Sequence, residues 1–176
     1  MKKFLCLFLC LLMLCGFTAC AVEDTPTKET NSNQEQKATE STEPTDDIFK
    51  LNETAVFKSL KVTATEMKSS NGDEFFKPAD GKTFVGVKFT IENTSDEAQS
   101  ISSLLSFTAY ADDVKCDYSF NAACAFDEGT LDGDIAAGKK LIGWYAVEIP
   151  RDWKSLEIDF QPDLLSNNTA KFVLTK

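Results

Sequence analysis

Hydrophobic and polar residues alternate with a period of two in several stretches beyond residue 50. Residues 85, 87, 89 and 91 are large and apolar, whereas Lys88 and Thr90 between them are polar. The same alternation marks residues 156–161, and residues 141–149 follow it too, but with Ile142 and Trp144 on the other face. A period of two places alternate side chains on opposite faces of a strand, one of them in a core. The pattern therefore predicts β-strands.

Further strand-like stretches and the turn signals between them complete this pattern. The additional strands are expected in residues 57–67, 107–110, 114–120 and 172–174. Turn residues cluster at 71–73, 78–81, 93–97, 132–134, 137–138 and 162–163. The stretch 141–149 is apolar on both faces, which predicts a central strand covered on both sides. About seven short strands at this spacing indicate an antiparallel β-sandwich, with at most a short helical turn near residues 102–105 and a turn near Asn121.

Residues 20–46 differ sharply from the rest of the chain. Residues 21–46 contain no aromatic residue, and they carry seven acidic residues against Lys28 and Lys37. Such a segment cannot bury enough apolar surface to fold. We therefore predict a disordered acidic tether over 20–46, with a maximal length of about 90 Å, and one folded domain over 47–176.

The first 19 residues resemble a bacterial lipoprotein signal peptide. Lys2 and Lys3 precede an apolar run at 4–14, and Ala19 precedes Cys20. The resemblance implies that Cys20 receives a diacylglyceryl lipid and becomes the N-terminus after cleavage at 1–19. The alternative is an ordinary signal peptidase site at residues 19–21, which would release the protein. The apolar run has 11 residues, whereas a membrane-spanning helix needs about 20.

The predicted cleavage leaves two cysteines for the folded domain. Cys6, Cys10 and Cys15 leave with the signal, and Cys20 carries the lipid. Outside the cytosol Cys116 and Cys124 are permitted to form a disulfide. A single straight strand would hold them roughly 26 Å apart, so the bridge requires a turn between them. Two buried thiols without a bridge are the alternative.

The net charge narrows the choice of partners. It is −10 for the whole chain, and loss of Lys2 and Lys3 with the signal makes it −12. A protein of this charge is a poor partner for nucleic acid. It is also not attracted to anionic lipid, which leaves membrane attachment to the acyl chains.

Three blocks of sequence resemble an immunoglobulin-like domain of unknown function that is common in Gram-positive lipoproteins and similar to secreted antigens. The blocks are residues 81–97 (GKTFVGVKFTIENTSDE), 106–113 (SFTAYADD) and 135–150 (IAAGKKLIGWYAVEIP). The chain departs from the family pattern at Val114 and Ala137, where glycine and proline are usual. The resemblance implies an all-β, immunoglobulin-like antiparallel sandwich in an extracytoplasmic setting, with no agreed activity.

The composition argues against an enzyme. There is no histidine in the chain, which excludes a histidine-based triad and histidine metal ligands. The serine-nucleophile patterns G-x-S-x-G and S-x-x-K are also missing. Carboxylates are plentiful, but sequence cannot show the separation that defines a glycosidase pair. We predict a protein without catalytic activity and without a cofactor beyond the lipid on Cys20.

Two groups of residues are candidates for binding. The aromatic residues Phe75, Phe76 and Trp153 fall in expected loops and are candidates for an exposed patch. A second group is acidic and falls in a glycine-containing loop: Asp127, Glu128, Asp132 and Asp134. This loop does not have EF-hand spacing, so we interpret it as a solvated acidic loop, with a calcium site as the alternative.

These observations predict a lipid-anchored module at the outer face of the cell membrane that binds a protein or cell-wall ligand. One alternative is an accessory or sensing domain that regulates a neighbouring membrane protein. Another is a carboxylate-based enzyme that acts on cell-wall material.

Overall fold

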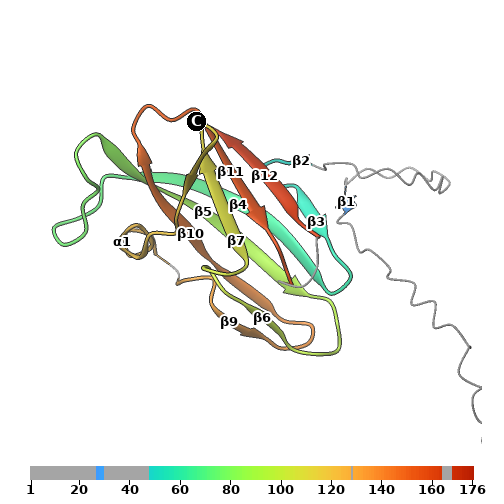
Figure 1. The fold of residues 1–176 in the computed structure, drawn as a ribbon. Coiled ribbons are helices and arrows are strands. Elements are labelled where there is room, and N and C mark those ends of the chain that lie inside the picture. Colours follow the sequence, from blue (N-terminus) through green and yellow to red (C-terminus); the bar gives the residue numbers. More distant parts are fainter. Residues whose placement is uncertain (1–26, 30–47, 128, 164–167) are drawn as a thin grey trace, which may run out of the picture.

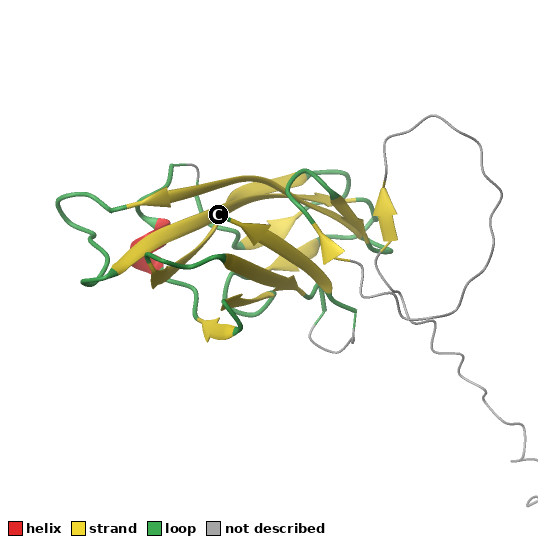
Figure 2. Ribbon diagram, turned by 90° about the horizontal axis from the view of Figure 1, so that it is seen from above, coloured by secondary structure: helices red, strands yellow, loops and turns green. Residues whose placement is uncertain are grey.

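Two β-sheets pack face to face in the computed structural model, which describes residues 27–29, 48–127, 129–163 and 168–176 (Figures 1 and 2). The first sheet has the order β1 (Thr27–Glu29), β3 (Thr54–Val56), β4 (Leu60–Ser70), β5 (Lys82–Asn93), β10 (Lys140–Pro150). The second has the order β2 (Ile48–Phe49), β12 (Ala170–Thr175), β11 (Ser155–Phe160), β7 (Phe107–Ala111), β8 (Val114–Cys116). All strand pairs of these two sheets are antiparallel except that of β2 with β12. The predicted β-sandwich is confirmed.

Two smaller elements complete the described part of the chain. β6 (Gln99–Ile101) and β9 (Gly133–Ile135) form a two-stranded sheet at the bottom of Figure 1. The helix α1 (Phe120–Ala123) begins at Ser119, whose Oγ accepts a hydrogen bond from the N–H of Ala122 at 3.2 Å. It provides the turn predicted near Asn121, so the strand expected over 114–120 ends at Cys116. No helix among the described residues is long and apolar enough to cross a membrane.

The core lies between the two sheets and is rich in phenylalanine. Phe89 of β5 packs against Phe107 and Phe172 of the second sheet, with ring centroids 5.3 and 5.2 Å apart. Phe107 also contacts Phe160 at 5.0 Å. The apolar positions of the predicted alternation, at 85–91 and 156–160, are fully buried here. Each such side chain stabilises the fold by roughly 1.5–3 kcal/mol through burial.

Three strands of each sheet can be compared with the order of an immunoglobulin domain. β4, β5 and β10 lie in one sheet and β7, β11 and β12 in the other, as strands A, B, E and C, F, G do in that fold. β5 and β11 would correspond to strands B and F, and neither contains a cysteine. The immunoglobulin-like part of the prediction therefore rests on strand order alone.

β10 is not a central strand, contrary to the prediction. It is the last strand of its sheet among the described residues. Two segments that include Tyr118 and Thr130 cover its outer edge instead, through β-bridges from Tyr118 to Val147 and from Thr130 to Trp144. Gly143 permits this approach, since a Cβ at that position would lie 2.8 Å from the carbonyl oxygen of Thr130. Both faces are buried over residues 143–147, as predicted, but Ile142 on the outer face is 49 % exposed.

Part of the predicted tether is a strand. Residues 27–29 form β1 and pair antiparallel with β3, with Thr27 opposite Val56. The ammonium of Lys28 lies 2.7 Å from the carboxylate of Glu53. The sequence gives no strand signal here, because all three residues are polar and β1 pairs with β3 through its backbone. The remaining residues of the tether, and Cys20 with the signal peptide, lie outside the described residues.

Candidate binding site at the β6–β9 end

A cavity of about 750 Å³ opens at the end of the sandwich where β5 ends and β10 begins. We call it the end cavity. Segments far apart in sequence form its walls: the β3–β4 turn, β6, the loop after β6, and residues 161–163 and 168 after β11. Its lining residues are Phe57, Lys58, Ser59, Ala98, Gln99, Ser100, Ile101, Ser102, Leu105, Ser106, Gln161, Pro162, Asp163 and Asn168.

The lining mixes apolar and neutral polar groups. Half of its residues have hydroxyl or amide side chains, apolar atoms make up the larger part of its exposed surface, and the two charged residues, Lys58 and Asp163, have opposite signs. Leu105 is 60 % exposed and offers an apolar surface at the cavity. Such a mixture suits a ligand that is held by hydrogen bonds and by apolar contact rather than by charge.

The loop that follows β6 is held in place by Asp132. One carboxylate oxygen accepts a hydrogen bond from the N–H of Ser103 at 2.8 Å, and the other accepts from its hydroxyl at 3.0 Å. The N–H of Ser106 donates to the carbonyl of Ser102 at 2.8 Å and closes the loop. This turn confirms the short helical turn expected near residues 102–105. The wall of the end cavity is therefore fixed by side-chain hydrogen bonds.

Asn93 holds β6 and β9 at the end of β5. Its Nδ2 donates to the carbonyls of Glu97 and Ile135, at 2.7 and 2.8 Å. Its Oδ1 accepts from the N–H and the hydroxyl of Ser95, at 2.9 and 2.7 Å. Each hydrogen-bonding position that the amide needs is thus filled, although the residue is fully buried.

The described part of the chain does not gather the acidic candidates into a metal site. The carboxylate of Asp132 binds Ser103, and that of Asp134 accepts a hydrogen bond from the hydroxyl of Ser100. Asp127 lies elsewhere, beside Trp144 and Phe126. Glu128 lies outside the described residues. Among the residues with described positions, no group of three or more cysteine or carboxylate side chains is placed to hold a metal ion.

The prediction that Phe75, Phe76 and Trp153 form one exposed aromatic patch is wrong. Phe75 is 84 % exposed, whereas Trp153 is only 2 % exposed and belongs to the main core. Phe76 is half-buried against a small cluster that contains Phe84 and Ala122. The three residues therefore have three different environments, and Phe75 alone remains a surface residue.

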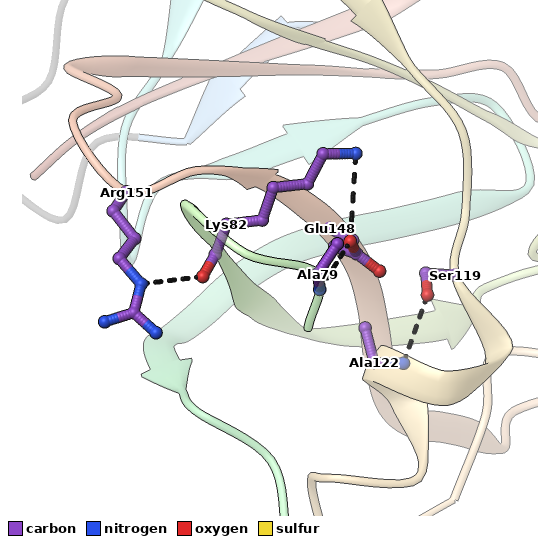
Figure 3. A network of polar contacts seen from close by, with 6 residues as sticks. All are labelled: Ala79, Lys82, Ser119, Ala122, Glu148 and Arg151. Atoms are coloured by element: carbon purple, nitrogen blue, oxygen red, sulfur yellow. Dashed lines mark hydrogen bonds and ion pairs between the residues drawn. The ribbon is translucent and has the colours of Figure 1, made fainter. Parts of the chain in front are cut away.

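A second cavity, of about 590 Å³, lies near the opposite end of the sandwich. Two of its charged groups, Lys82 and Glu148, serve the local fold, as Figure 3 shows. The carboxylate of Glu148 accepts a hydrogen bond from the N–H of Ala79 at 3.1 Å and lies 3.7 Å from the ammonium of Lys82. Arg151 donates from Nε to the carbonyl of Lys82 at 2.8 Å. These contacts fasten the β4–β5 loop to β10, so we favour the end cavity as the binding site.

Asp159 is a candidate that the sequence did not single out. It lies beside the end cavity, because the small pocket that it lines shares Leu105, Ser106 and Gln161 with that cavity. Burial raises the pKa of this carboxyl, and nearby Lys171 opposes the shift. Its Oδ1 is buried without a hydrogen-bond partner. The period-two pattern marks Asp159 only as a polar position of β11, so no sequence signal distinguishes it from Glu157.

The structure leaves Cys116 and Cys124 unbridged. Both are free cysteines, the first half-buried and the second exposed. The possible disulfide is therefore not formed, and only Cys116 resembles the buried thiol of the alternative. Burial raises the pKa of Cys116 to about 11, which makes it a poor nucleophile.

We expect iodoacetamide at pH 8 to alkylate Cys124 much faster than Cys116. The thiolate fraction of Cys116 falls about 100-fold for a pKa two units above the ordinary value, and its half-buried position slows the reaction further. Peptide mass spectrometry after timed quenching measures each cysteine separately. Equal rates would contradict the described burial, and protection of both until a reductant is added would show a disulfide.

Comparison with known proteins places this fold in a family. A family model described as a domain of unknown function, DUF4352, matches residues 49–171. The comparison with curated proteins gives no significant match.

Solved structures show the same fold at low sequence identity. The "putative lipoprotein (ycdA)" from Bacillus subtilis has a TM-score of 0.56 at 16 % identity, over 66 % of this chain and 36 % of that one. The yjhA protein from Bacillus subtilis has a TM-score of 0.53 at 16 % identity, over 72 % and 97 %. An uncharacterized β-sandwich protein from Clostridium difficile has a TM-score of 0.50 at 18 % identity, over 80 % and 99 %. This chain thus spans about a third of ycdA but nearly the whole of the other two.

Proposed function

The chain belongs to the DUF4352 family of domains of unknown function, and we propose that here the domain is a non-catalytic binding module. In this proposal it is lipid-anchored through Cys20 at the outer face of the cell membrane, and its ligand enters the end cavity. An immunoglobulin-like sandwich gathers its loops at its two ends. In this proposal the loops at one end form the binding site.

The end cavity is the observation that carries this proposal. Its volume of about 750 Å³ lies in the range of small-molecule and peptide sites. Hydroxyl and amide groups line the cavity together with the exposed Leu105, and the loop that bears Leu105 is fixed by the hydrogen bonds of Asp132. A site that is already ordered loses little entropy on binding.

The membrane anchor is supported by the sequence before the domain. Ala19 and Cys20 follow a short apolar run, as in lipoprotein signals. One structural neighbour, ycdA, is named as a lipoprotein. Two acyl chains on Cys20 would suffice for stable attachment, without a contribution from the acidic domain.

A carboxylate enzyme is the second candidate, and Asp159 is the observation that favours it. A half-buried carboxyl with a raised pKa can act as a general acid. The usual glycosidase mechanism needs a second carboxyl at a defined separation. The carboxylate of Glu157 is 2.5 Å from the ammonium of Lys171 and is engaged there. Binding is therefore the better-supported function.

Photo-crosslinking in living cells tests the proposal. A benzoylphenylalanine at position 105 probes the end cavity, and one at position 75, which is exposed at the other end, is the control. We expect a reproducible adduct from position 105 only. We also expect the intact protein to carry a lipid mass on Cys20 and the Cys20→Ser variant to leave the membrane fraction.

Two results would contradict parts of this proposal separately. Identical adducts from positions 105 and 75, or none from either, would argue against a specific ligand in the end cavity. A membrane-associated protein without lipid on Cys20 would overturn the anchor and leave the cavity as a site in an otherwise attached or secreted protein.

A further inference from the structure

β1 attaches the predicted tether to the same end of the sandwich as the end cavity. Thr27 pairs with Val56 at the end of β3, and the next three residues of the chain after Val56 line the cavity. β1 runs antiparallel to β3, so the chain enters β1 at the cavity end. The Lys28–Glu53 ion pair at 2.7 Å holds the middle of the strand.

This attachment limits how far the domain can lie from a lipid on Cys20. Seven peptide units join Cys20 to Thr27, which span at most about 25 Å. Without β1, the first described residue after Cys20 that is paired with the domain is Ile48. The 28 peptide units between Cys20 and Ile48 span at most about 100 Å. In general, flexible chains of seven and 28 units have root-mean-square spans of about 15 and 29 Å. β1 therefore shortens the connection and brings the cavity end closest to the membrane.

The opposite end of the domain lies well away from this attachment. β10 has 11 residues and runs the length of the first sheet, which corresponds to roughly 35 Å. The β4–β5 loop with Phe75 protrudes from that far end, at the left of Figure 1. A domain with an excess of seven acidic residues over 47–176 is also repelled by anionic lipid, which disfavours lying flat on the surface.

β6 presents an unpaired strand edge to the end cavity. In the described part of the chain β6 pairs with β9 alone. Successive residues 98–102 all line the cavity. Neighbouring side chains of a strand point to opposite faces, so a cavity on one face would contact only every second residue. We therefore infer that the cavity lies along the edge of β6. An edge strand leaves half of its N–H and C=O groups for another strand.

We infer that β1 holds the end cavity toward the membrane, and that the cavity receives an extended segment of an integral membrane protein, which pairs with the edge of β6. The inference rests on the proposed function, including the lipid on Cys20. A polypeptide segment fits the edge because strand addition uses backbone hydrogen bonds. A lipid headgroup fits less well, because the lining has one cation and one anion rather than a cluster of cations.

Energy transfer on vesicles tests the orientation without lipidation in cells. The chain 20–176, which contains every described residue, carries Cys116→Ser and Cys124→Ser so that Cys20 alone couples to a maleimide lipid. The vesicles consist of phosphatidylcholine with a small fraction of acceptor-labelled lipid. A donor dye on an azidophenylalanine is placed at position 105 or at position 75. We expect clearly stronger transfer from position 105.

Two variants separate β1 from the rest of the tether. Lys28→Pro removes a backbone donor and the ion pair with Glu53, so the mean separation from the bilayer should about double and transfer from position 105 should fall. Lys37→Pro makes the same change outside β1 and should leave transfer unaltered. Equal transfer from positions 105 and 75, or equal effects of the two prolines, would overturn the orientation. Near-ultraviolet circular dichroism checks that each variant is folded.

The identity of the captured molecule tests the occupant. In intact cells, crosslinkers at positions 100 and 105 should capture the same integral membrane protein, at residues of one short extracytoplasmic segment. Capture of only a soluble protein, a lipid or wall material at these positions would overturn this inference while supporting the proposed binding function. Absence of any adduct would count against both, whereas the vesicle result would still decide the orientation.

Discussion

Replacement of Asn93 by alanine should lower the free energy of unfolding by about 3–4 kcal/mol. The substitution removes four hydrogen bonds at once, to the carbonyls of Glu97 and Ile135 and from the N–H and hydroxyl of Ser95. Asn93 is fully buried, and so is its hydrogen bond to the carbonyl of Ile135, which water cannot readily replace. A buried carbonyl that loses its donor costs about 1–3 kcal/mol, and the three part-buried hydrogen bonds add to this loss.

Chemical denaturation at neutral pH measures this effect, and two further variants make it specific. Asn93→Asp should be at least as damaging, because it replaces the amide donor by an acceptor that faces two carbonyl oxygens. Asn71→Ala, an asparagine in the exposed β4–β5 loop, should change the free energy of unfolding by less than about 0.5 kcal/mol. A loss below about 1 kcal/mol for Asn93→Ala would show that the loops rearrange to satisfy the exposed carbonyls.

The strands could be predicted because one physical constraint acts on nearly every residue in them. Val85, Val87, Phe89 and Ile91 face the core from one side of β5, and the chain can present them to one face only as a strand. The asparagine at position 93 also belongs to the recognised sequence pattern, but the sequence does not show that its side chain joins β5 to β9. That role depends on residues more than 40 positions away.

The place of β10 in its sheet could not be predicted in the same way. Apolar residues on both faces indicate that both faces are covered, and they do not identify the covering element. In this fold the cover on the outer face includes Phe126, whose ring stacks on Trp144 at 5.0 Å. Whether a neighbouring strand or a loop with aromatic residues covers β10, the pattern of apolar residues within β10 is the same.

The end cavity could not be predicted from the sequence, for a further reason. Its walls come from short segments near residues 57, 100, 105 and 162, and these contain the serine, glutamine and proline residues that are common in any loop. Only the sheet geometry brings them together. β1 is similar, since its pairing with β3 depends on backbone groups that every sequence has.

Replacement of Trp153 by alanine should lower the free energy of unfolding by about 3–5 kcal/mol, the range for removal of a buried large aromatic side chain. The expected fall in melting temperature is on the order of 10–20 °C. Trp153 follows the Pro150 end of β10, in a sequence that reads as an exposed turn. It is buried because the carboxylate of Asp112 accepts hydrogen bonds from the N–H groups of Lys154 and Ser155, at 3.0 and 2.9 Å, and this holds the turn against the core.

Two matched variants distinguish packing from binding at these aromatic positions. Trp153→Phe should cost only about 1–2 kcal/mol, since the indole Nε1 has no hydrogen-bond partner to lose and the phenyl ring fills most of the space. Phe75→Ala should leave the melting temperature nearly unchanged, because the ring is 84 % exposed. Differential scanning calorimetry measures all three. If Trp153→Ala melted like Phe75→Ala, the tryptophan would be at the surface and the aromatic patch that the sequence suggests would exist after all.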